Sequence, residues 1–494
     1  MTLTDTNAQS VLEDLEPQEV LQHFATLASI PRGSGNEAGV AAWVVDFARG
    51  HGLTAEEDEL HCVLVRKPGQ HGLEEAPGLI LHGHLDMVCE KEEGVEIDFA
   101  TEPIRLIVDG DLITADGTSL GADNGIGVSY ILALLASTEI AHPPIEAVLT
   151  AMEEKGKVGA GQFDTSRLTG TRMIDFNWIT DREILAGCSG DITFTVDVPG
   201  EAEATPAGLT GLLVKARGLK GGHCEFDIHL ERANALQVLA RAHQAIAAAF
   251  DVRSAAPTGG AQNNAIPADA EQLFAVRAED VDGVRRLLDD LTATLRAEYA
   301  IADPDLRLEA EEAATPERVF STAAADRLAA VTRLIPHGVI SWNLAVPGRV
   351  ESSNNLGTVR PTEDGARLMA TITAASTSRK HEVLDRVRSL AGAVGGGVVV
   401  EEFGLDAPEF PYRPDSPLLK TAVDTYLDVF GRRPDVEVSQ CSLELGMFSA
   451  NVPDLDVISI GTELHALHSP AESVNHRSVA AVWPYVQQVV SRLS

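Results

Sequence analysis

Two polar residues, His84 and Asp86, end an apolar run in the segment LILHGHLDMV. Because side chains two positions apart in a strand share a face, both point to the same side. A metal-bound imidazole usually donates its other N–H to a carboxylate, so the pair has the residue types of a ligand and its orienting partner. Taken alone, a surface His beside an Asp explains the pattern better. His82 lies on the same side, and we expect it to line the strand end without binding metal.

Three acidic residues follow in glycine-rich surroundings. Asp123 lies among Gly residues in TSLGADNGIG, where it either caps a helix or lies between two cations. Glu153 and Glu154 are adjacent at the end of the apolar run EAVLTAM, so their side chains diverge. One is then free to bind a metal while the other reaches a metal-bound water. Two exposed loop glutamates are an equally good explanation of this dipeptide alone.

Three histidines outside this region are further candidates. His465 and His468 follow the apolar run DVISIG in a loop marked by Pro470, where a solvated His is the simpler explanation for either residue. His223 follows two glycines in GLKGGHCE and is either a turn residue or a residue that reaches a site on another domain. Taken together, the histidines and acids form a mixed nitrogen and oxygen ligand set that suits two zinc ions bridged by Asp123. The set contains no thiolate, which argues against a structural zinc site.

The pattern of predicted elements indicates an α/β protein. Short apolar runs alternate with helical stretches up to Cys188, and the same texture returns from about Asp406. Between them, alternating strands and Ala-rich helices contain few acid and His clusters, and no sequence repeat is visible. We therefore predict a larger α/β domain in two parts, residues 1–190 and 406–494, interrupted by an inserted domain, residues 191–405. Ligands in such sheets gather at the carboxyl ends of the strands.

Composition excludes several classes of partner. The chain has 494 residues, and 38 Lys and Arg against 74 Asp and Glu give a formal net charge of −36. So acidic a surface repels phosphate backbones and anionic lipid headgroups, so we expect neither nucleic acid nor membrane as a partner. No apolar run has the length of a membrane span and the first residues lack a signal-peptide pattern, which predicts a cytoplasmic location. The five Cys are few, odd in number and widely spaced, as expected of reduced thiols.

An ordered series of motifs resembles a known family over nearly the whole chain. The motifs are IPRGSGNE, HGHLDMVCEK, ADGTSLGADNGIG, MEEKGKVGA, GCSG, GLKGGH, NNAIP, SLELG and LHSP. They resemble the metallopeptidases with a co-catalytic zinc pair that include aminoacylases and glutamate carboxypeptidases, and above all the aminoacyl-histidine dipeptidase branch, also called Xaa-His or cytosol non-specific dipeptidase. The resemblance implies an α/β zinc-peptidase-like catalytic domain with a central mixed sheet, interrupted by an inserted α+β lid domain.

The resemblance also implies an activity and residue roles. The activity is hydrolysis of small peptides, dipeptides with a free N-terminus, by zinc-activated water at two Zn²⁺ per chain, with Co²⁺ or Mn²⁺ as alternatives. By this resemblance His84 and His468 bind one zinc each, Asp123 bridges the two, and Glu154 is a further ligand. Glu153 is the general base and Asp86 orients His84. His223 of the lid stabilises the oxyanion. A homodimer formed through the lid domain stays an open alternative to a monomer.

The chain departs from the family pattern at the remaining metal-binding Asp. That position falls on Asn177 of MIDFN, and Asp175 on the same strand face is an alternative ligand. The usual lid motif GGHSG reads GGHCE, which changes Cys224 and Glu225, and Gln440 replaces a family His. Two other hypotheses therefore stay open: a catalytically silent relative that binds peptides or proteins, and an amidohydrolase of N-acyl amino acids.

Overall fold

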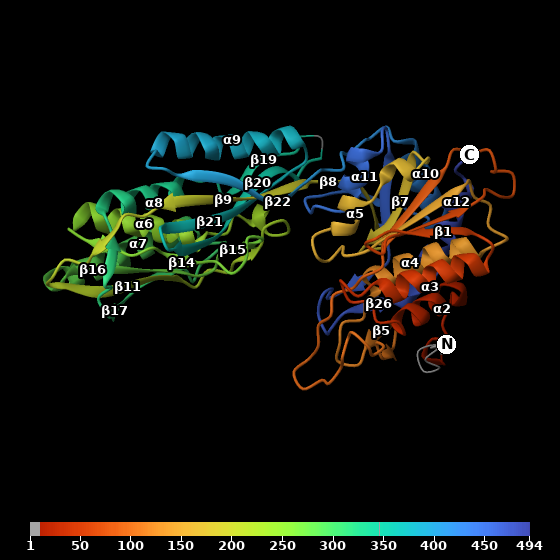
Figure 1. Ribbon diagram of the computed structural model, residues 1–494, viewed down its shortest axis with the longest axis horizontal. Helices are drawn as coiled ribbons and strands as arrows, with labels where there is room; N and C mark the ends of the chain where they lie inside the picture. The colour runs from red at the N-terminus through yellow and green to blue at the C-terminus, as the bar shows by residue number, and fades with distance from the viewer. Residues whose placement is uncertain (1–9, 345) are drawn as a thin grey trace. The chain divides into compact units, whose positions relative to one another are not determined.

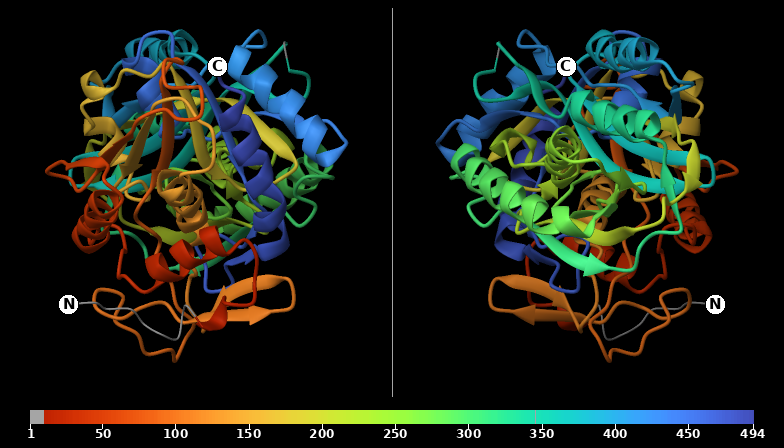
Figure 2. Two further views of the ribbon diagram at one scale, coloured as in Figure 1. Left: turned by 90° about the vertical axis from the view of Figure 1, so that its right-hand side faces the viewer. Right: turned by 90° about the vertical axis from the view of Figure 1, so that its left-hand side faces the viewer.

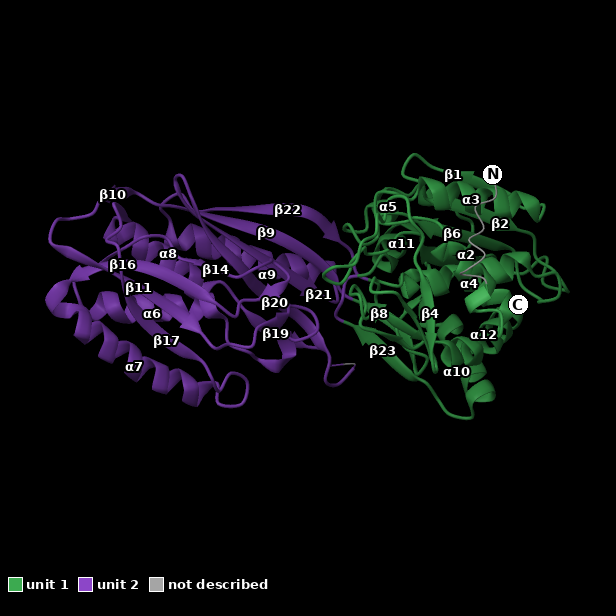
Figure 3. Cartoon of the chain, turned by 90° about the horizontal axis from the view of Figure 1, so that it is seen from below, with its two compact units in different colours: residues 1–188, 410–439, 443–494 green, residues 189–409, 440–442 purple. Residues whose placement is uncertain are grey.

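The computed structural model describes residues 10–344 and 346–494, which form two compact units. Unit 1 comprises residues 1–188, 410–439 and 443–494, and unit 2 comprises residues 189–409 and 440–442 (Figure 3). Unit 1 is therefore assembled from both ends of the chain, with unit 2 as an insertion. No helix among the described residues combines the length and the apolarity that crossing a membrane requires.

Unit 1 is an α/β domain built on a mixed eight-stranded sheet in the order β1-β2-β6-β3-β7-β24-β8-β23 (Figure 1). Its helices are α2 (Gln18–Ala28), α3 (Ala38–Gly50), α4 (Ala122–Ala136), α5 (Val158–Gln162), α10 (Pro417–Phe430), α11 (Leu445–Asn451) and α12 (His476–Ser491). The strands of the sheet are β1 (Thr54–Glu57), β2 (Val63–Lys67), β3 (Leu79–His84), β6 (Ile145–Thr150), β7 (Arg172–Trp178), β8 (Glu183–Cys188), β23 (Asp435–Ser439) and β24 (Asp456–Gly461).

Strands β6, β3, β7 and β24 are parallel neighbours at the centre of this sheet. All residues of β3 and β6 are buried, as expected for strands covered on both faces. Helices α2, α3, α4, α10 and α12 cover one face, where Tyr130 of α4 stacks on Trp483 of α12. On the other face, Phe448 of α11 contacts the ring of His82. Because β3, β6, β7 and β24 run parallel, their carboxyl ends meet at one edge.

A second, four-stranded sheet lies at the margin of unit 1. It consists of β25 (Leu464–His465), β26 (Ser473–Asn475), β5 (Leu112–Ala115) and β4 (Leu106–Asp109). Both views of Figure 2 show the β4–β5 hairpin in orange projecting from the unit. The loop between β25 and β26 contains His468, so this sheet holds the C-terminal ligand candidate.

Unit 2 contains a continuous antiparallel sheet whose main path is β17-β11-β16-β14-β20-β21-β9-β22. Its strands are β9 (Gly190–Pro199), β11 (Leu209–Arg217), β14 (Thr258–Gly259), β16 (Ala270–Arg277), β17 (Arg307–Ala313), β20 (Val350–Thr362), β21 (Gly365–Ala374) and β22 (Val399–Ala407), with β13 (Arg253–Ser254) and β19 (Gly338–Trp342) at the side. Its helices are α6 (Ala235–Ala249), α7 (Val281–Glu298), α8 (Thr322–Leu334) and α9 (Thr377–Val394). Two short pairs complete the unit: β10 (Ala202–Ala204) with β18 (Arg318–Phe320), and β12 (Gly222–His223) with β15 (Ala265–Ile266).

The same βαββαβ arrangement occurs twice in unit 2. One half runs β11-α6-β14-β16-α7-β17, and the other runs β9-α8-β20-β21-α9-β22. In each half the fourth strand lies beside the first and the third beside the second, and β14 pairs with β20 where the halves meet. The first half is inserted between β9 and α8 of the second, which hides the repeat in the sequence. The predicted fold class, a central mixed sheet with a separate inserted α+β domain, is confirmed.

Candidate metal centre

The ligand candidates of unit 1 lie at strand ends and in loops. His84 is the last residue of β3, and Glu153 and Glu154 follow the neighbouring strand β6. Asp123 lies in the first turn of α4 with non-helical backbone dihedrals. His468 has a positive φ of 58° in the loop after β25. The parallel ends of β3 and β6 thus bring residues far apart in sequence to one edge of the sheet.

Asp123 lies between the two imidazoles. Its Oδ1 is 3.0 Å from Nε2 of His84, and its Oδ2 is 3.5 Å from Nε2 of His468. Nε2 of His468 also lies 2.9 Å from Oε1 of Glu154. Each carboxylate oxygen of Asp123 therefore faces a different His, which is the arrangement that a bridging ligand requires.

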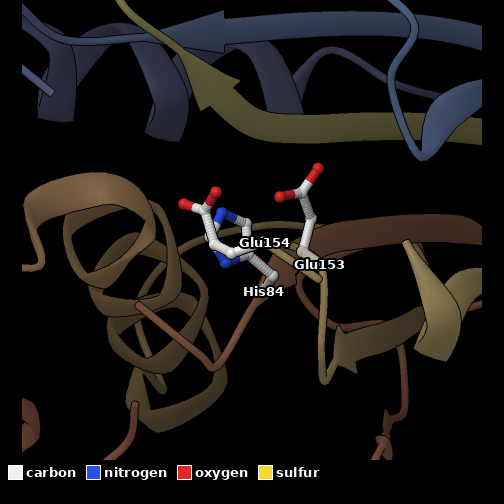
Figure 4. Close-up of side chains that lie close together, drawn as sticks. All are labelled: His84, Glu153 and Glu154. Carbon is white, nitrogen blue, oxygen red and sulfur yellow. The ribbon is translucent and has the colours of Figure 1, made fainter. Parts of the chain in front are cut away.

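Two groups of side chains have ligand atoms close enough to hold a metal ion. In one group, atoms of His84, Glu153 and Glu154 all lie within 4.8 Å of one another, and in the other the same holds for Asp123, Glu154 and His468. Figure 4 shows the Glu154 carboxylate beside the His84 imidazole, with Glu153 directed to another side. Imidazole nitrogens and carboxylate oxygens are ligands that zinc accepts. The donor set therefore fits divalent cations.

Burial and hydrogen bonding shift the pKa values of these groups strongly. Burial favours the neutral form of Asp123, but hydrogen bonds from His468 and His84 outweigh it and lower its pKa below the usual range. Hydrogen bonds to Asp123 and Glu154 raise the pKa of His468 to about 10. Burial raises the pKa of Glu153 to about 8, with Glu444 and Glu154 adding to the rise and His84 opposing it. Burial and the neighbouring acids thus favour the protonated form of Glu153 when no metal is bound.

Asp86 holds the backbone of the two glutamates. Its Oδ1 accepts the N–H of Glu153 at 3.0 Å, and its Oδ2 accepts the N–H of Glu154 at 3.2 Å and the hydroxyl of Ser34 at 2.7 Å. Its Oδ1 also lies 3.5 Å from Nδ1 of His84, too long for a strong hydrogen bond. Asp86 thus links the ends of β3 and β6 in addition to facing His84.

The residues at the family's remaining Asp position have separate partners. Asp175 is buried and accepts hydrogen bonds from Nδ1 of His82 at 2.8 Å, from Ser459 and from the N–H of Asn177. The Asn177 Oδ1 accepts a hydrogen bond from Asn124 at 2.7 Å. Asp175 is thus the hydrogen-bond partner of His82, which belongs to neither group of candidate metal ligands.

His82 forms a buried network that the sequence did not indicate. Its Nε2 lies 3.2 Å from Oε2 of Glu444, which also accepts the Thr150 hydroxyl at 2.6 Å. Burial favours the neutral ring, but hydrogen bonds to Asp175 and Glu444 raise the pKa of His82 to about 9. His82 lines the strand end, as expected, and does so between two carboxylates. The SLELG motif was the available signal for Glu444, and no local pattern marked its pairing with His82.

The remaining site candidates differ in their surroundings. His223 belongs to unit 2. Its ring Nδ1 accepts the backbone N–H of Glu225 at 3.2 Å, and the backbone N–H of His223 donates to the Asp227 carboxylate at 2.9 Å. Its neutral ring therefore carries the proton on Nε2. His465 is exposed and lies 3.7 Å from Glu463. Sequence reasoning also passed over Arg32 and Glu472, two buried charged residues that contact the Asp123 turn.

Residues 80–492 match the family described as Peptidase family M20/M25/M40. The chain is also 32% identical over 487 residues to the cytosol non-specific dipeptidase of Escherichia coli (strain K12), covering 98% of this chain and 99% of the relative. The chain belongs to the M20 peptidase family. The family and the branch predicted from the motifs are thereby confirmed.

Solved structures share the fold of this chain. The aminoacylhistidine dipeptidase from Vibrio alginolyticus is 33% identical with a TM-score of 0.89, and the match covers 97% of both chains. An aminopeptidase from Bacillus cereus shares the fold at 13% identity, with a TM-score of 0.56 over 97% of this chain and 99% of that chain. The individual roles of the M20 site residues stay predictions.

Proposed function

We propose that this M20 peptidase hydrolyses dipeptides with a free N-terminus at a centre of two divalent metal ions, preferably Zn²⁺, with Co²⁺ or Mn²⁺ as substitutes. The observation that carries the proposal is the approach of Asp123 to both His84 and His468 through different carboxylate oxygens. The two relatives that are 32% and 33% identical to this chain over nearly its whole length carry dipeptidase names, which supports this substrate class. The Escherichia coli relative is named a cytosol enzyme, which supports a cytoplasmic location.

Each residue of the centre has its own part in the proposed reaction. His84, Asp123, Glu154 and His468 would hold the ions, and the Asn177 side chain would add an amide oxygen to the ion that His84 binds. Ions held there would polarise the scissile carbonyl and lower the pKa of bound water. Glu153 takes the proton of the attacking water and passes it to the leaving amine. Asp86 keeps Glu153 and Glu154 at fixed positions through their backbone N–H groups.

Comparing substrates tests this activity against the two alternatives. The zinc-loaded protein should hydrolyse an Xaa-His dipeptide and fail on the same dipeptide with an acetylated N-terminus. Preference for N-acyl amino acids would instead identify an amidohydrolase. Zinc uptake and dipeptide binding without turnover of any of these substrates would identify a silent relative.

The His223→Ala variant should have about 10²-fold lower turnover with unchanged metal content. Because Nδ1 accepts a hydrogen bond, Nε2 carries the proton that His223 would donate to an oxyanion, and losing such a donor costs a factor of this size. Steady-state kinetics and elemental analysis of the variant measure both quantities. Unchanged turnover would reduce His223 to a turn residue.

The Asn177→Asp variant should tighten the ion beside His84 by about tenfold or more and raise turnover, because a carboxylate adds a negative charge next to the cation. Asn124 would still donate to the new side chain. Asp175 instead accepts hydrogen bonds from His82 and Ser459. Asp175→Asn should therefore lower the melting temperature, and it should not lower the zinc affinity of one site relative to the other. Calorimetric zinc titration of both variants checks this, and equal zinc affinities in Asn177→Asp and wild type would show that residue 177 lies outside the centre.

A further inference from the structure

A buried carboxylate holds the turn that carries Asp123. Glu472 is only 2% exposed, and its Oε2 accepts the backbone N–H groups of Leu120 at 2.8 Å and Gly121 at 3.0 Å. Its Oε1 accepts the N–H of Asp123 at 3.2 Å. Both oxygens of this carboxylate are therefore acceptors for backbone donors of one short segment.

Arg32 holds the same turn through the backbone carbonyl group of Gly121. It is buried, and its Nη2 donates to the carbonyl oxygen of Gly121. Its Nη1 donates to the carbonyl oxygens of Leu85 at 3.0 Å and Asp86 at 3.2 Å. The guanidinium thus joins the turn to the segment that follows His84.

The start of α4 explains why a distant carboxylate is useful there. The first N–H groups of a helix lack intrahelical partners, and a side chain near the N-terminus commonly accepts them. Gly121, which precedes α4, has no side chain to accept these N–H groups, and the backbone at Asp123 and Asn124 is not helical. Asp123 is the acidic side chain of the first turn. Glu472 accepts the backbone N–H groups of Gly121 and Asp123 in its place. The Asp123 carboxylate is thereby left to face His84 and His468.

We infer that Glu472 and Arg32 are positioning residues that clamp the Asp123 turn between the segments bearing His84 and His468, and so set the metal affinity of the centre. The inference rests on the proposed function for the identity of the bound ions. Glu472 lies in the same loop as His468, so one residue links this loop to the turn. The motifs IPRGSGNE and LHSP, which border or include the two residues, gain a role that the reaction itself does not give them.

The Glu472→Gln variant tests the clamp, because an amide must place its NH₂ group against a backbone N–H at one of the two acceptor positions. We expect the metal-stripped full-length variant to bind Zn²⁺ about 10- to 100-fold more weakly than wild type, the usual effect of losing an outer partner of a metal ligand. Hydrogen exchange of the metal-free protein should be faster in the peptide that covers residues 118–126. Glu472→Asp keeps both oxygens and should recover part of the affinity, and it also serves if Glu472→Gln fails to fold.

The matched control is Glu463→Gln, which removes an acid of the same region whose carboxylate accepts a hydrogen bond from Asn475 instead. It should leave both zinc affinity and the exchange of residues 118–126 at wild-type values. Wild-type zinc affinity and wild-type exchange in folded Glu472→Gln would overturn the inference. Absence of zinc uptake by the wild-type protein would overturn the proposed function, and the exchange of residues 118–126 would still decide whether Glu472 holds the turn.

Discussion

Asp123→Ala should lose both metal ions and, with them, all measurable dipeptide hydrolysis. One Asp123 oxygen faces His84 and the other faces His468, so its removal takes a ligand from each ion at once. It also leaves fewer negative charges to offset two divalent cations in a partly buried site. Elemental analysis of the purified variant measures the loss directly.

The control for this variant is Asp116→Ala, which removes an exposed carboxylate a few residues away. It should keep the wild-type zinc content and turnover. A full zinc complement in Asp123→Ala would show that Asp123 does not bridge, and a retained single zinc would assign it to the other ion alone.

Glu153→Gln should keep both ions and lower turnover by about 10²- to 10⁴-fold, the range for losing a general base. The amide retains the shape of the side chain but accepts no proton, and the backbone N–H of residue 153 still donates to Asp86. Zinc content and the maximal rate, measured on the same preparation, separate binding from chemistry.

Glu154→Gln gives the matched contrast, because Glu154 belongs to both groups of candidate ligands. It should lower zinc affinity as well as turnover. If Glu153→Gln loses its zinc or keeps full turnover, the base lies elsewhere and the two adjacent glutamates need other roles.

The elements that carry the centre were predictable because their sequence signals are local. The apolar runs around His84 and before Glu153 correspond to β3 and β6, which are buried throughout. The run DVISIG corresponds to the strand β24, Asp456–Gly461. Since parallel strands end at one edge, polar residues just after them were expected to converge. His84 ends β3 and Glu154 follows β6, as this rule expects, whereas Asp123 reaches the edge from the turn at the start of α4 and His468 from the loop after β25.

The partners of the buried charges were not predictable in this way. The Glu472 contacts with Gly121 and Asp123 span about 350 residues, and the His82 contact with Asp175 spans 93. Such pairs leave no periodic signal, because within its own segment each member is an ordinary polar residue. For the same reason the sequence left Asp175 open as a metal ligand, whereas its hydrogen bonds place it with His82.

The repeat within unit 2 was hidden by its connectivity. Its halves share the order of helices and strands, but one half is inserted inside the other between β9 and α8. A nested insertion offers no fixed sequence period to detect. The burial pattern of each half is set by its own packing, so similar topology arises without similar residues.

Zinc titration of the metal-stripped full-length protein, with bound zinc and hydrolysis of an Xaa-His dipeptide measured in each sample, tests the central claim most directly. We predict no hydrolysis without metal, and turnover that rises with bound zinc up to two ions per chain. Dipeptide hydrolysis by the metal-free protein would contradict the claim, as would full zinc uptake with no hydrolysis of any dipeptide.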